Sequence, residues 1–314
     1  MLSRTADSLY WLARYVERTE NVARIVQVGH RMASMARSLG SAGNEWLPTL
    51  IATGCEPGFF AKYDEATASA VIDYLVRDSD NPSSIATCID TARGNARGVR
   101  TALTVDMWDA LNDTWQRFRD NVGAALSNDR LPDFLEWVKE RSLLFNGAYS
   151  STMLRNDAYY FTRLGTSIER ADNTARILDV KYHMLLPHHE GVGGALDYYQ
   201  WQAILRSVSA LRSYHWIYHD RLKPWLVAEL LMLRPEMPRS LLSCYDQITR
   251  QLDLLAQAYG GKRGECHRLA GDMHAKLRYG RIQDIFQSGL HEFLTEFIDR
   301  SILLGSEISA LYLT

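Results

Sequence analysis

The chain is poor in cysteine and has no long apolar run, and both absences exclude classes of protein. Its four cysteines among 314 residues are scattered without a CxxC spacing, which argues against a disulfide framework and against a zinc site. We expect reduced, buried thiols. No run of about 18 uncharged apolar residues occurs, so no transmembrane helix is expected. Arg4, Asp7, Arg14 and Glu17 interrupt the first segment too early for the apolar core of a signal peptide, which predicts a cytoplasmic protein.

The chain also lacks an excess of either charge and any nucleotide-binding motif. Its formal net charge is −2, so no overall field favours nucleic acid or an acidic membrane surface as a partner. Neither a P-loop nor a GxGxxG, GxSxG or kinase signature is present. We therefore expect no cofactor, and no nucleotide-driven chemistry within this chain.

Strand patterns are scarce as well, whereas apolar residues recur at the three- and four-residue steps of helices. This periodicity predicts helices over residues 4–38, 64–78, 82–102, 104–126, 130–150, 155–185, 196–219, 222–234, 239–259, 265–277 and 281–312. Loops rich in glycine and proline are expected at 38–60 and 187–194. Asn81 and Pro82 are suited to the N-cap and the first helical position of the third helix. The sequence thus predicts an all-α protein.

One pattern occurs twice. The segment LARYVERTENVARI at 12–25 and the segment LGTSIERADNTARI at 164–177 are identical at half of their positions. A second pair, PSSIATCID at 82–90 and PRSLLSCYD at 238–246, repeats at a similar separation. Two repeats in the same order indicate an internal duplication.

The duplication predicts a helical bundle of two pseudo-twofold-related halves, residues 1–153 and 154–314. Each half begins with a long amphipathic helix, and no proline-rich linker separates them, so we expect one shared core. We also expect the two first helices to pack antiparallel about the pseudo-twofold axis, with Glu17 and Glu169 close together.

The repeated motif places polar residues on one helical strip. At about 100° per residue, Glu17, Asn21 and Arg24 share a strip, whereas Arg18 projects toward the apolar side. The second copy places the equivalent residues in the same way: Glu169, Asn173, Arg176 and Arg170. Three interpretations of the strip are open: a solvated face with i,i+4 pairs, an internal polar seam, or a ligand site. Because Glu, Asn and Arg are the same in both copies, the last two interpretations are favoured. An arginine on a core-facing side needs a partner, so Arg18 and its counterpart are expected to make inter-helix hydrogen bonds, as an architectural clamp or within a site.

A third stretch, TARGNARGVR, is rich in arginine. Its polar candidates are Arg93, Asn95, Arg97 and Arg100. The three guanidiniums share one helical face and repel each other unless carboxylates or an anionic ligand meet them. Glu17 or Glu169 could supply such a carboxylate, and so could a substrate carboxylate or phosphate.

Three histidines are weaker candidates. His183 lies two turns beyond the second polar strip and could exchange protons there, although a structural role is the simpler interpretation. His215 and His219 have the i,i+4 spacing of metal ligands. Only these two ligands are identifiable, so no metal site is predicted and the pair stays a weak candidate.

Three segments together resemble the bacterial alpha-E family, a helical domain named for its Glu-Arg motif. They are LYWLARYVERTENVAR, NPSSIATCIDTARGNARGVR and TSIERADNTARILDVKYH, in the family's order and across most of the chain. The signature positions that the resemblance carries over are Glu17, Arg18, Asn21, Arg24, Arg93, Asn95, Arg97, Glu169, Arg170, Asn173 and Arg176. The resemblance implies that the protein acts together with circularly permuted ATP-grasp amide ligases and transglutaminase-like peptidases. Their shared role would be to make, modify or degrade a peptide or amide-linked product.

Three functions follow as hypotheses. The first is an accessory protein that partners an ATP-grasp amide ligase, and possibly a transglutaminase-like protein, and binds an acidic or peptide-like ligand. The second is a stand-alone enzyme acting on a peptide or amide, with Glu17 or Glu169 as general base and the arginines holding a substrate carboxylate. The third is a purely structural module whose polar seam fixes the register of its helices.

Overall fold

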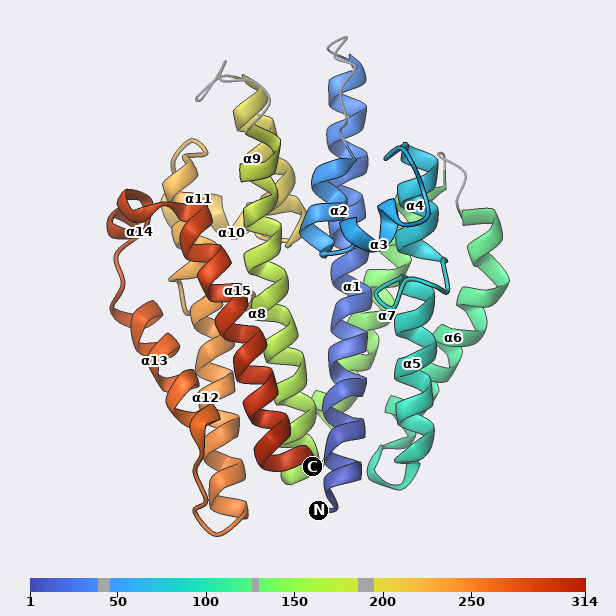
Figure 1. Ribbon diagram of the computed structural model, residues 1–314, viewed down its shortest axis with the longest axis vertical. Helices are drawn as coiled ribbons and strands as arrows, with labels where there is room; N and C mark the ends of the chain where they lie inside the picture. Colours follow the sequence, from blue (N-terminus) through green and yellow to red (C-terminus); the bar gives the residue numbers. More distant parts are fainter. Residues whose placement is uncertain (39–45, 126–129, 186–194) are drawn as a thin grey trace.

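The computed structural model describes residues 1–38, 46–125, 130–185 and 195–314, and every regular element within these ranges is a helix (Figure 1). In chain order the elements are α1 Ser3–Ser38, α2 Leu47–Thr53, α3 Glu56–Phe60, α4 Ala68–Val76, α5 Ile85–Gly98, the 3-10 turn η1 Arg100–Ala102, α6 Val105–Ala125, α7 Leu131–Thr152, α8 Asp157–Leu185, α9 Ala195–Ser207, α10 Leu211–Tyr218, α11 Pro224–Met232, α12 Leu241–Ala258, α13 Glu265–Tyr279, α14 Ile282–Ser288, α15 Leu290–Ile308 and the π turn η2 Ser309–Leu313. The all-α prediction is confirmed.

Several predicted boundaries are wrong, for local reasons. The expected loop 38–60 contains α2 and α3, each with a proline in its first turn. The predicted helix 196–219 is broken after α9, where Ser209 adopts a positive φ, and helix 281–312 is broken at Gly289. The N-cap of α5 is Ser84 rather than Asn81, because the Ser84 hydroxyl accepts the amide of Thr87. The whole loop predicted at 187–194 lies outside the described residues.

Helices α1 and α8 form the centre of the molecule, with α2–α7 on one side and α9–α15 on the other (Figure 1). The amino group of Met1 lies 3.0 Å from Asp157, near the start of α8, and Arg14 and Arg18 reach Glu169 further along it. The two helices therefore advance in the same direction, and the antiparallel expectation is wrong. A local twofold axis that relates α1 to α8 must therefore be parallel to the two helices, not perpendicular to them.

The apolar core crosses the expected boundary near residue 153. The largest buried cluster combines Leu9 and Ile25 of α1, Phe161 of α8, Leu252 of α12 and Phe297 of α15. A smaller cluster lies among α1–α7 alone. The two halves thus share a core, whereas the duplication itself stays a prediction from the sequence.

Close packing of α1 on α8 depends on one glycine. A Cβ added to Gly165 would lie 2.3 Å from the carbonyl oxygen of Tyr10 and 3.3 Å from the Cβ of Ala13. The backbones of the two central helices approach closely at this point, because glycine leaves room for them.

We expect Gly165→Ala to lower the free energy of unfolding by about 3 kcal/mol, since the helices must separate to admit the methyl group. Gly147→Ala in α7 is the matched control: nothing lies within 4 Å of its added Cβ. That change should stabilise the protein by up to about 1 kcal/mol through helix propensity. Urea unfolding measures both, and equal effects of the two substitutions would contradict the packing argument.

Candidate functional site

The two Glu-Arg pairs exchange partners across the interface of α1 and α8. Arg18 donates to Glu169 through Nε at 2.6 Å and through Nη2 at 3.2 Å. Arg170 donates to Glu17 through Nε at 3.0 Å and through Nη2 at 2.7 Å. Both contacts are bidentate, the strongest geometry for a guanidinium and a carboxylate. The predicted inter-helix hydrogen bonds of the two arginines are present, and Glu17 and Glu169 lie close together in the interior.

Each carboxylate also binds a second arginine. The Arg14 Nε lies 2.8 Å from Glu169, and the Arg239 Nη1 lies 2.8 Å from Glu17. Burial alone would raise the pKa of both carboxyls, which are 1% and 2% exposed, but the guanidiniums of their partners outweigh it and lower each pKa to about 2. Both groups are therefore carboxylates at neutral pH and weak proton acceptors.

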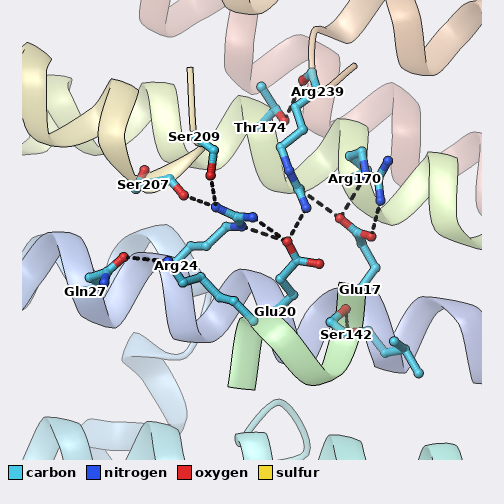
Figure 2. A network of polar contacts seen from close by, with 12 residues as sticks. Glu17, Glu20, Arg24, Gln27, Ser142, Arg170, Thr174, Ser207, Ser209 and Arg239 are labelled. Carbon is cyan, nitrogen blue, oxygen red and sulfur yellow. Dashed lines mark hydrogen bonds and ion pairs between the residues drawn. The ribbon is translucent and has the colours of Figure 1, made fainter. Parts of the chain in front are cut away.

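The surroundings of Glu17 form a closed network, defined here as Glu17, Glu20, Arg24, Arg170, Ser207, Ser209 and Arg239 (Figure 2). Arg239 bridges Glu17 and Glu20. Arg24 binds Glu20 along its own helix and donates to the carbonyl of Ser207 and the hydroxyl of Ser209. The charged groups are thus held by one another, and only Oε2 of Glu20 among their carboxylate oxygens makes no hydrogen bond to the described residues.

The surroundings of Glu169 contain a cavity of about 210 Å³, called the ER cavity below. Its lining residues are Arg18, Asn21, Val22, Thr53, Gly54, Ser83, Glu169, Asp172, Asn173 and Arg176. Arg176 binds Asp172 one turn earlier, with Nε 2.7 Å from the carboxylate. The polar strip of each motif copy therefore faces the interior, and the strip of α8 borders an open space.

Two buried amides in the ER cavity have unused hydrogen-bonding atoms. The Oδ1 of Asn21 and the Nδ2 of Asn173 make no hydrogen bond within the described part of the chain. These residues are only 4% and 3% exposed. A buried polar atom without a partner is costly, so such a pair points to a ligand that completes it.

The arginine-rich stretch does not join this site. Arg93 donates to Asn112 at 3.0 Å, and its guanidinium lies 4.0 Å from the ring centre of Trp115. Arg97 is exposed on α5, and Arg100 lies in η1 against the ring of Trp108. Tryptophans of α6 contact the guanidiniums of Arg93 and Arg100, whereas Glu17 and Glu169 bind other arginines. The half-exposed Asn95 is likewise absent from the lining of the ER cavity.

The histidine candidates do not converge on the ER cavity either. His183 lies within α8, but its side chain falls outside the described residues. His215 and His219 are exposed, and His219 has left the helix with a φ of 49°, so the two no longer share a helical face. Among the described residues no group of three or more potential ligands is placed to hold a metal ion. The four cysteines are free and buried as expected: Cys55, Cys88, Cys244 and Cys266.

A larger hollow of about 700 Å³ lies between α10 and the loop before α12. It is an open surface depression, bordered by Trp216, a residue that is 82% exposed. No residue of the repeated motif lines it. The ER cavity is therefore the better candidate, because its polar groups are buried and incompletely bonded.

Sequence reasoning missed residues that complete both networks. They are Arg14, Gly54, Ser83, Asp172, Glu20 and Arg239. A signal for two of them existed in the second repeated pair, where Ser83 of PSS aligns with Arg239 of PRS. Glu20 and Asp172 occupy equivalent positions of the repeated motif, and Arg14 lies one turn before Glu17 in α1. Gly54 follows α2, and its place at the cavity depends on how α2 packs on the central helices.

Comparisons with known proteins relate the chain to a helical family. A family described as "a predicted alpha-helical domain with a conserved ER motif" matches residues 1–313. Uncharacterized protein Mb2597 of Mycobacterium bovis and uncharacterized protein MT2643 of Mycobacterium tuberculosis are each 24% identical over 318 residues. The alignments cover 94% of this chain but only 35% of each relative, so the chain spans about a third of their length. No solved structure matches the chain.

Proposed function

The chain belongs to the Alpha-E family, and from that premise we propose that it is an accessory component of an ATP-grasp-type amide ligase. In this proposal it holds an acidic or peptide-like ligand in the ER cavity while the partner forms or modifies a peptide or amide-linked product. The observation that carries the ligand-binding part is the cavity beside Glu169, with its buried and unsatisfied amides.

The charges around the ER cavity support an acidic ligand. Three guanidiniums, those of Arg14, Arg18 and Arg176, meet two carboxylates, those of Glu169 and Asp172. One positive charge is therefore in excess. Arg18 and Arg176 each use Nε and Nη2 for these pairs, which leaves their Nη1 atoms without a hydrogen bond to the described residues. Such donors suit a carboxylate.

The need for a partner has separate support. The sequence contains no phosphate-binding loop, so a second protein would carry out any ATP-dependent step. The mycobacterial relatives contain about twice as much additional chain beyond the matched third. That additional chain is long enough for a further domain, and we propose that a separate protein plays the corresponding part beside this chain. A transglutaminase-like protein is a further proposed partner.

The location of the protein belongs to the same proposal. No described helix is both long and apolar enough to cross a membrane. We place the protein in the cytoplasm, where ATP-dependent ligation would occur, and cell fractionation tests this.

Two other functions receive less support. A stand-alone enzyme would need Glu17 or Glu169 as general base, and a pKa of about 2 makes both poor proton acceptors at neutral pH. A purely structural module fits the closed network around Glu17, but it gives no role to the ER cavity around Glu169.

The test is reconstitution with the partner. We expect the tagged protein to co-purify with an ATP-grasp ligase, and product formation by that ligase to require the tagged protein. Ser83→Arg, which fills the ER cavity, should retain the ligase but lose product formation. Ser150→Arg on the exposed face of α7 adds the same charge elsewhere and should behave as wild type. Recovery of the protein without any ligase, or full activity of Ser83→Arg, would overturn the proposal.

A further inference from the structure

The closed network provides a template for what the ER cavity lacks. Arg239 precedes the first turn of α12, and Ser83 occupies the same place before α5. In both, the following serine is the N-cap: Ser84 accepts the amide of Thr87 at 3.1 Å, and Ser240 that of Ser243 at 3.0 Å. The local backbone is thus alike, and the side chains differ. Where Arg239 fills the closed network, Ser83 leaves space.

A second difference lies at the ends of α2 and α9. Gly54 follows α2 with a φ of 68°, and Ser209 lies just beyond α9 with a φ of 59°. The Ser209 hydroxyl accepts from Nη1 of Arg24 at 3.5 Å. At Gly54 an added Cβ would lie 3.3 Å from Nη1 of Arg176, but glycine offers no hydroxyl. The ER cavity therefore lacks an acceptor in the place where the closed network has one.

These two differences define complementary gaps. Arg239 bridges Glu17 and Glu20, whereas Ser83 makes no such bridge between the equivalent carboxylates, Glu169 and Asp172. Glu169 is bound by Arg14 and Arg18, and Asp172 by Arg176, but no cation among the described residues joins the two carboxylates. The Oε1 of Glu169 accepts one hydrogen bond, from Arg18, whereas Oε1 of Glu17 accepts from two arginines. The Nη1 of Arg176 lacks an acceptor. A molecule that fills both gaps must carry a cation and an anion.

The structure assigns the ER cavity to an acidic amino acid, free or at the end of a peptide, with its ammonium group at Glu169 and Asp172 and a carboxylate at Arg176 and Asn173. This inference rests on the proposed function and names its ligand class. The second carboxylate of an acidic amino acid matches the one excess positive charge of this group of side chains, to which Arg14 contributes through its ion pair with Glu169 from outside the cavity lining. A volume of about 210 Å³ is smaller than the sites of drug-sized ligands and suits one small molecule.

A simple dicarboxylate fits less well, since it brings no cation to bridge Glu169 and Asp172 and adds charge of the same sign beside them. A neutral amino acid fits both gaps but leaves the excess positive charge unmatched. The order of affinity that follows is acidic amino acid, then neutral amino acid, then dicarboxylate.

Calorimetric titration of the full chain with L-glutamate and L-aspartate tests the assignment. We expect at least one of them to bind, and its counterparts without an ammonium group, glutarate or succinate and the N-acetyl amino acid, to bind at least tenfold more weakly. Ser83→Arg places a guanidinium in the ER cavity, at the position equivalent to that of Arg239 in the closed network, and should abolish binding. Ser150→Arg should bind as wild type, and circular dichroism checks that both variants are folded.

The possible failures are distinguishable. If glutarate or succinate binds as tightly as the amino acid, the ammonium subsite is wrong, while the proposed function stands. If neither amino acids nor dicarboxylates bind the wild type, both the assignment and ligand binding in the ER cavity are wrong. Binding that persists in Ser83→Arg would place the amino acid elsewhere and overturn the assignment.

Discussion

Replacing Glu17 with glutamine is expected to lower the free energy of unfolding by about 4 kcal/mol. Glu17 is 1% exposed and accepts hydrogen bonds from both Arg170 and Arg239. Removing one partner of a buried ion pair leaves an uncompensated buried charge. Here it removes the negative charge that Glu17 supplies to two guanidiniums. Chemical denaturation monitored by circular dichroism measures the change.

The equivalent change on the other helix should cost less. Glu169→Gln also leaves two guanidiniums, but Arg14 and Arg18 have 17% and 23% of their side chains exposed, against 15% and 11% for Arg170 and Arg239. The ER cavity also lies beside Glu169, so water can solvate the freed groups. Glu140→Gln on the exposed face of α7 is the matched control and should change stability by less than about 0.5 kcal/mol. A smaller loss for Glu17→Gln than for Glu169→Gln would contradict the distinction between the closed network and the ER cavity.

The protein is expected to lose stability steeply in acid, between about pH 5 and pH 2. The folded state holds the pKa of Glu17 and of Glu169 at about 2, below the ordinary value of 4.5, because their arginine partners outweigh burial. The unfolded chain therefore takes up protons before the folded chain does. The stabilisation is complete at a pH above the pKa that the two carboxyls have in the unfolded chain. It is lost as the pH falls toward their pKa in the folded protein. Each carboxylate contributes about 3 kcal/mol by this linkage.

Unfolding free energies measured from pH 7 to pH 2 test this expectation. In Glu17→Gln one of the two linked groups is absent, so the acid limb should be shallower by up to about 1.4 kcal/mol per pH unit. The Glu140→Gln control should follow the wild-type curve. Parallel acid limbs for wild type and Glu17→Gln would show that this carboxylate does not have its lowered pKa in the folded protein.

The helical character of the chain and the importance of its repeated motif are predictable from local sequence patterns. Apolar residues at helical spacing are a local signal, so the long helices α1 and α8 could be predicted close to their true ends. Burial of an arginine on a core-facing side requires a partner, which predicted the inter-helix bonds of Arg18 and Arg170. The breaks at Ser209 and Gly289 were missed, because each depends on the backbone conformation of a single residue.

Which groups meet depends on how the helices pack. The direction of α8 beside α1 is fixed by long-range packing at Gly165 and by charge pairs between distant residues, so periodicity could not reveal that the helices are parallel. Arg93 and Arg100 looked like partners for Glu17 and Glu169, but their guanidiniums lie against tryptophans of α6 instead. The contrast between the closed network and the ER cavity comes from Ser83 and Arg239, whose significance depends on where their backbones place them. A helical pattern specifies which residues share one helix face, whereas a site is made where faces of several helices converge.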